Sequence, residues 1–321
     1  MPLPDPVLPD PVATGPVLPD PMPADAGPAA SGGLRVLDSA WRFDAIGTTW
    51  QIDTDAPLDA VARARVESRI AEYDRTWSRF RSDSAASRLR TEPGEHVFPA
   101  EAVELFALYD ALVELTGGGV TPFVGDALEQ LGYDPAYSLV PRGPVVPAPS
   151  WADAREGGGA SLRTRAGVVL DVGAAGKGQL VDLVLDELAL AGVGRAVVDA
   201  SGDLRARGVG AYRVALEHPF DARRAIGVAE PGERALCASA GNRRVWGDGL
   251  HHVLDGRTGR PVDTVVATWA VADTALVADG LATALFVCPP EVLAERFDFE
   301  FVRVLSDGTL HYSPRFPGEV F

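Results

Sequence analysis

Apolar residues recur at helical spacing in four parts of the chain. This period places apolar side chains on one face of a helix. It predicts helices over residues 59–77, 100–116, 179–191 and 276–287, and a shorter helical turn within 121–131. Gly117 and Gly192 follow the second and third of these segments directly. Because glycine readily takes the left-handed conformation that ends helices, both glycines support these boundaries.

Alternating and β-branched segments predict the strands. A strand is expected over 41–53, interrupted by Gly47, and a hairpin over 162–172 with its turn at 165–167. Further strands are expected over 195–199, 213–217, 267–271, 301–305 and 309–312. Strands and helices mix without a strict β-α-β alternation. The pattern therefore favours an α+β fold of mixed, mainly antiparallel sheets with packed helices over a doubly wound fold.

Residues 1–33 differ from the rest of the chain. They are rich in proline, contain no basic residue and repeat Pro-Val-Leu-Pro-Asp-Pro. Because proline fixes φ and removes a backbone donor, neither helix nor sheet can propagate there. We expect an extended, disordered acidic tail, with a docking segment as the alternative, followed by one folded domain over 34–321.

Charge and composition exclude some functions. The 321 residues carry a formal net charge of −16, which argues against a general binder of nucleic acid or anionic membranes. No apolar run is long enough for a membrane span, and no signal peptide or lipobox is visible, so a cytoplasmic location is expected. Cys237 and Cys288 lack metal or redox spacing and are expected to be buried thiols.

The segment from Leu170 to Gly178 offers the first candidate site. It has an apolar run ending in Asp171, then small residues, then Lys177 at the start of a helical pattern. Glycines allow close backbone approach, and a helix N-terminus favours anions. The pattern fits a phosphate site, although a tight structural turn would look the same. It matches neither a P-loop nor a dinucleotide-binding glycine motif.

Two further segments carry chemistry. Asp279 and Thr283 are four residues apart, so both lie on one helix face and offer hard oxygen ligands suited to Mg²⁺. The alternative is an ordinary acidic first turn with a threonine bonded to its own helix. His252 precedes an Asp255-Gly256-Arg257 turn, and this cluster of polar side chains makes His252 a candidate site residue.

Taken in order, these segments resemble the ApbE family of FAD:protein FMN transferases. The resemblance runs from about Ala45 to Val287 and rests on motifs that are weak alone but occur in the right order along the chain. They are Ala45–Thr48, Ser78–Leu89, Gly118–Tyr133, Leu170–Asp182 with Ser201–Asp203, Ser239–Arg243 with His252–Pro261, and Ala278–Thr283.

The resemblance implies an enzyme that binds FAD with Mg²⁺, attaches FMN to a threonine or serine hydroxyl of a partner protein, and releases AMP. It places the metal on the Ala174 carbonyl, Asp279 and Thr283. It places Lys177 and Asp171 against FAD. His252 is the candidate for proton transfer, with orientation of a phosphate or of the Asp255 turn as its alternative. The residues expected to line the flavin pocket are Ile46, Phe80, Thr121, Pro122, Phe123 and Val253.

The chain departs from the family pattern at several positions. Thr121 and Phe123 stand where the family has aspartate and threonine, Gly256 replaces a proline, and Ser201 replaces a glycine. The changed Thr121 segment leaves two alternatives to transfer. One is a non-catalytic FAD-binding protein or flavin carrier, and the other is an FAD pyrophosphatase that yields FMN and AMP.

Overall fold

The computed structural model describes residues 13–14 and 37–321. The tail expected over 1–33 lies outside these residues except for Ala13 and Thr14, and its boundary at residue 34 stays a prediction. In the described part no helix is long and apolar enough to cross a membrane. Cys237 and Cys288 are both free and buried, as expected.

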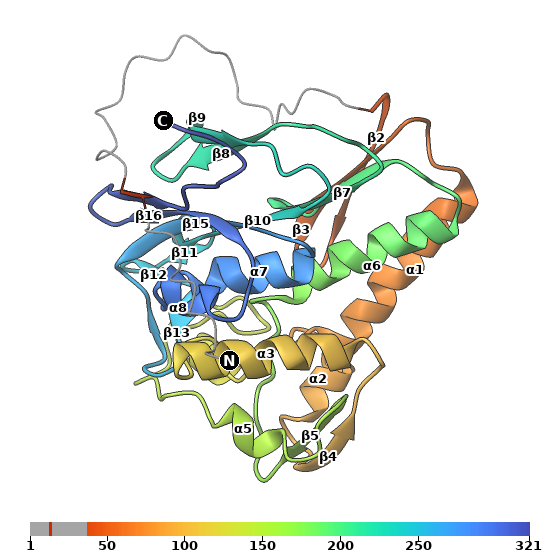
Figure 1. The fold of residues 1–321 in the computed structure, drawn as a ribbon. Helices are drawn as coiled ribbons and strands as arrows, with labels where there is room; N and C mark the ends of the chain where they lie inside the picture. Colours follow the sequence, from red (N-terminus) through yellow and green to blue (C-terminus); the bar gives the residue numbers. More distant parts are fainter. Residues whose placement is uncertain (1–12, 15–36) are drawn as a thin grey trace, which may run out of the picture.

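A nine-stranded sheet forms the centre of the molecule (Figure 1). Each strand pairs antiparallel with its neighbours, so the expected α+β class with antiparallel sheets is confirmed. From one edge to the other the strands are β1 (Ala13–Thr14), β17 (Leu310–Tyr312), β16 (Glu300–Leu305), β15 (Val265–Ala272), β10 (Ala235–Ala240), β7 (Asp203–Arg207), β6 (Ala196–Asp199), β3 (Thr48–Thr54) and β2 (Ser39–Ala45).

Four long helices lie on one side of this sheet (Figure 1). They are α1 (Ala60–Trp77), α3 (Ala102–Thr116), α6 (Gly176–Leu190) and α7 (Ala275–Ala284), close to their expected bounds. The side chains of Asp59 and Thr274 cap α1 and α7 by accepting bonds from the amides of Ala62 and Val277. Gly117 ends α3 in the left-handed conformation, as predicted. Short helices α2 (Ala85–Arg88), α4 (Gly125–Gln130), α5 (Trp151–Ala154) and α8 (Pro290–Ala294) complete this layer.

A small sheet packs on the opposite face. Its strands, β8 (Val214–His218), β9 (Asp221–Ala229) and β18 (Gly318–Val320), enclose a second apolar core. Three two-stranded pairs lie outside these layers: β4 (Gly94–Val97) with β5 (Ser161–Thr164), β11 (Val245–Trp246) with β12 (Leu250–His251), and β13 (Leu254–Asp255) with β14 (Arg260–Pro261).

Two strand predictions were wrong. The segment 41–53 is two strands joined at Ile46 and Gly47, whose φ values of 45° and 76° suit a two-residue hairpin turn. The expected hairpin over 162–172 does not form, because β5 pairs with β4 instead. The residues that follow β5 make isolated backbone hydrogen bonds instead of a strand ladder. Val168 N donates to Leu89 O, and Asp171 N donates to Pro122 O. The β-branched run there thus reflects burial rather than a strand ladder.

Gly178 marks the close crossing of α6 and α7. A Cβ at this position would lie 2.0 Å from the Ala275 carbonyl oxygen and 2.7 Å from Asp279 Cβ. We therefore expect Gly178→Ala to lower the free energy of unfolding by about 3 kcal/mol, measured by urea denaturation, because the two helices must separate. Gly194→Ala is the control, since a Cβ there meets open space. Equal effects of the two substitutions would contradict this packing.

Candidate active site

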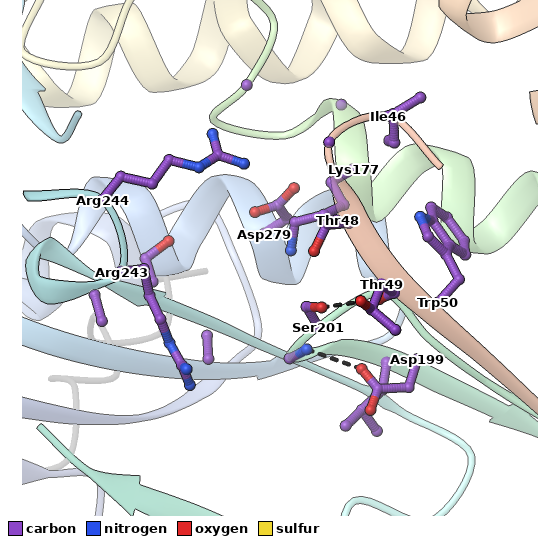
Figure 2. Close-up of a pocket in the computed structure, with 18 of the residues that line it drawn as sticks. Ile46, Thr48, Thr49, Trp50, Lys177, Asp199, Ser201, Arg243, Arg244 and Asp279 are labelled. Carbon is purple, nitrogen blue, oxygen red and sulfur yellow. Dashed lines mark hydrogen bonds between the residues drawn. The ribbon is translucent and has the colours of Figure 1, made fainter. Parts of the chain in front are cut away.

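A cleft with a volume of about 1730 Å³ opens beside the first turn of α6. Its walls include the β2–β3 hairpin, the first turn of α6, the middle of α7, and loops at residues 78–80, 119–121 and 252–254. Residues of β8, β9 and the segment 238–244 also line it. In Figure 2 Ile46 lies at the hairpin turn, and Lys177 and Asp279 lie together on neighbouring helices. The cleft therefore joins segments from almost the whole length of the described chain.

Lys177 forms a buried ion pair with Asp203 at the floor of the cleft. Its Nζ also donates to the Ala200 carbonyl oxygen over 3.1 Å. The Asp203 side chain is 0% exposed, whereas that of Lys177 is 27% exposed. Burial alone lowers the pKa of Lys177, but the carboxylates of Asp203 and Asp279 outweigh burial and raise this pKa overall. Lys177 is therefore a fixed positive charge at neutral pH.

Asp279, Thr283 and the Ala174 carbonyl form a set of hard oxygen atoms along one wall. Asp279 Oδ2 accepts from the Gly178 amide over 2.9 Å, and Thr283 Oγ1 donates to Ala174 O over 3.3 Å. Burial, and next the charge of Asp203, raise the pKa of Asp279 well above its usual value. A cation would offset both effects and hold this carboxylate ionised.

The chemistry of these donors fits Mg²⁺, which prefers oxygen ligands and keeps several waters. Among the described residues no three His, Cys, Asp or Glu side chains gather at a metal-binding distance. A metal here would thus rely on one carboxylate, a hydroxyl and a backbone carbonyl, with substrate oxygens completing its shell.

Asp171 is held by an arginine and an amide. Its Oδ2 accepts from Arg79 Nε over 2.5 Å, and its Oδ1 accepts from the Gly173 amide over 2.7 Å. The Arg79 guanidinium also lies 4.1 Å from the centre of the Phe80 ring. Tyr137 stacks on Phe80 at 5.2 Å. A rigid charged and aromatic corner therefore borders the cleft.

His252 is uncharged in this environment. Burial, and next the positive charge of Arg244, lower its pKa to about 4. Its Nδ1 is buried without a hydrogen-bond partner among the described residues. A neutral imidazole can accept a proton, and an anion bound beside it would raise its basicity.

The low pKa of His252 predicts acid sensitivity. The unfolded chain takes up the proton near pH 6.5 and the folded chain near pH 4, so stability falls as the pH drops between these values. Between pH 7 and pH 5 the unfolding free energy of wild type should fall by about 2 kcal/mol more than that of His252→Gln, as measured by urea denaturation. The control is His96→Gln, on β4 outside the cleft lining, which should show the same fall in unfolding free energy as wild type. An equal fall for His252→Gln would refute the role of His252 in acid sensitivity.

Comparison with known proteins identifies the family. The sequence model of the ApbE family matches residues 46–300. The chain belongs to the ApbE family. It is 28% identical to an FAD:protein FMN transferase of Vibrio cholerae over 71% of this chain and 74% of that protein. It is 27% identical to one from Rhodobacter capsulatus over 88% of this chain and 60% of that protein.

Solved structures of the family share the fold. The flavin transferase ApbE from Vibrio cholerae superposes with a TM-score of 0.71 at 23% identity, over 87% of this chain and 97% of that one. The apo flavinyl transferase ApbE from Pseudomonas stutzeri gives 0.68 at 26% identity, over 86% of this chain and 94% of that one. The expected family membership is confirmed.

Most residues that the ApbE resemblance singled out meet in the cleft. Those lining it are Ile46, Phe80, Thr121, Asp171, Ala174, Lys177, His252, Val253, Asp279 and Thr283. Pro122 and Phe123 do not line it. Phe123 is 1% exposed and packs 5.3 Å from Trp151, because the start of α4 directs it into the helical core. These two residues therefore lie outside the cleft lining in which the resemblance placed them.

Several cleft residues escaped the sequence analysis. Arg79, Ser201, Asp203, Ser239 and Arg244 contribute to the cleft or its ion pairs. All but Arg244 lie inside a motif that resembles the ApbE pattern, such as Ser-Gly-Asp after β6 or the Ser-Arg-Phe segment after α1, and Arg244 directly follows one. Their position in or beside these motifs was the only sequence feature that could have identified them. The residues that they contact are known only from the structure.

Proposed function

We propose that this protein is a Mg²⁺-dependent FAD:protein FMN transferase that modifies a threonine or serine hydroxyl of an acceptor protein and releases AMP. The proposal rests on family membership and on one observation. The oxygen set of Ala174, Asp279 and Thr283 lies in the same cleft as the Lys177–Asp203 pair and the neutral His252.

These residues suit a pyrophosphate substrate. The Ala174 carbonyl, Asp279 and Thr283 would hold Mg²⁺, and the ion when bound would neutralise charge that builds up on the phosphates. Lys177 adds a positive charge at the first turn of α6, where backbone amides favour anions. Ile46, Phe80, Thr121 and Val253 would border the flavin.

The transfer step exchanges a phosphoanhydride bond for a phosphate ester bond. The acceptor hydroxyl oxygen attacks the phosphorus of the FMN half, and a new P–O bond forms. The anhydride bond to AMP breaks, and AMP leaves with the bridging oxygen. The hydroxyl proton passes to the His252 imidazole, whose basicity the adjacent phosphate would raise. The products are FMN-modified protein, AMP and a proton.

Intact-mass measurement distinguishes this proposal from its alternatives. The protein is incubated with FAD, Mg²⁺ and a domain bearing a candidate acceptor threonine, with the Thr→Val form of that domain as control. A mass gain of one FMN on the first domain alone, with AMP release, supports transfer. FMN and AMP without modification indicate a pyrophosphatase, and unchanged FAD indicates a flavin carrier. The Thr121 departure from the family pattern keeps these alternatives in the test.

A further inference from the structure

Arg244 reaches into the cleft from a wall that the metal and phosphate residues do not occupy. It follows the 3₁₀ turn Gly241–Arg243 and precedes β11. In Figure 2 the Arg243 and Arg244 side chains point in different directions, and the Arg244 guanidinium extends into the cleft. Arg243 instead pairs with Glu217 at 3.1 Å.

The charge of Arg244 has no acidic partner. Among the described residues no carboxylate lies within ion-pair distance of it, although the chain carries a net charge of −16. Its Nη1 donates to the Tyr133 hydroxyl over 2.5 Å, and its guanidinium lies 5.7 Å from the Tyr133 ring centre. A neutral phenol thus orients the guanidinium and leaves its charge uncompensated.

Two other cations that line the cleft, Lys177 and Arg79, differ in this respect. Lys177 faces Asp203, and Arg79 faces Asp171. A pyrophosphate diester carries two negative charges, and the uncompensated charge of Arg244 suits one of its phosphates in addition to the proposed Mg²⁺. Arg244 and His252 both line this cleft. An anion bound by Arg244 would therefore share the cleft with His252, whose pKa is lowered by burial and next by the Arg244 charge.

We propose that Arg244 binds a phosphate of FAD through its guanidinium, held in place by Tyr133, and positions that phosphate beside His252. This assignment rests on the proposed function. Guanidinium and phosphate form paired, charge-assisted hydrogen bonds that a lysine cannot reproduce. Arg244 is thus a substrate-binding residue that reaches the cleft from the loop after β10, whereas the oxygen set comes from α7 and the segment before α6.

Fluorescence titration of FAD tests this assignment without any acceptor protein. We expect Arg244→Gln to raise the Kd for FAD about 30-fold, because a charge-assisted hydrogen-bond pair is lost. Arg244→Lys should raise it about fivefold, since the charge stays but the paired geometry is lost. Arg243→Gln removes the same charge from the adjacent residue and should leave the Kd within about twofold. Riboflavin, which has no phosphate, should bind wild type and Arg244→Gln alike.

The outcomes separate this assignment from the proposed function. A wild-type protein that does not bind FAD refutes the proposed function itself. If wild type binds FAD and Arg244→Gln binds it equally well, only the Arg244 assignment fails. An unchanged Kd with a raised KM for the acceptor would mean that Arg244 holds a carboxylate of that protein. Equal weakening of riboflavin would mean that the guanidinium stacks on the flavin ring, and both results overturn the phosphate assignment.

Discussion

Replacing Asp279 with alanine is expected to reduce FMN transfer by about three orders of magnitude, because the only carboxylate in the proposed metal set is removed. Thr283 and the Ala174 carbonyl would remain, but neither carries the charge that attracts a divalent cation. Transfer is measured as FMN-modified acceptor by intact mass. Asp279→Asn is the matched variant, since its amide oxygen can still accept from the Gly178 amide.

A thermal readout shows whether the loss comes from the metal. Wild type should melt at a higher temperature with Mg²⁺ and FAD together than with FAD alone, since a ligand of the folded state stabilises it. Asp279→Ala and Asp279→Asn should show no such increase. Full transfer by Asp279→Ala, or an unchanged response to Mg²⁺, would remove Asp279 from the metal set.

Replacing Lys177 with methionine is expected to lower the free energy of unfolding by about 3 kcal/mol, because Asp203 would be left buried without its cation. The partial exposure of Lys177 keeps the expected loss at the lower end of the range for buried pairs. Urea denaturation at pH 7 measures it. Transfer should fall as well, since the phosphates lose a neighbouring charge.

A double variant separates charge from packing. Lys177→Met with Asp203→Asn leaves no charge unpaired, so it should recover most of the lost stability while transfer stays low. If the single and double variants are equally unstable, the loss comes from packing around the Lys177 stem, and the ion pair contributes little.

The sequence was sufficient for the helices, whose periodicity and caps are local. Asp59 and Gly117 mark helix ends in the sequence and in the structure alike. It was insufficient where long-range pairing decides. The Val168–Val172 run has the composition of a strand but forms none. The strand before it, β5, was expected to pair with this run and pairs instead with β4, far earlier in the chain. At residue 46 a β-branched side chain occupies a left-handed turn, which local preference does not predict.

The candidate site shows the same division. Asp279 and Thr283 could be paired from their spacing on a helix, and the structure places both in the cleft. The partner of Lys177 could not be inferred, because Lys177 lies on α6 and Asp203 lies on β7. Phe123 was misplaced for a related reason. An aromatic residue suits a flavin pocket and a helical core equally well, and only the packing against Trp151 decides between them.

The walls of the cleft come from the β2–β3 turn near one end of the described chain and from α7 near the other. Any fragment that contains both walls spans most of the described chain, so the proposed FAD site requires a nearly complete domain. At a free FAD concentration 100 times its Kd, binding would add about 2.7 kcal/mol to the stability of that domain. The flavin supply of the cell would then set how much of this protein is open to proteolysis at any moment.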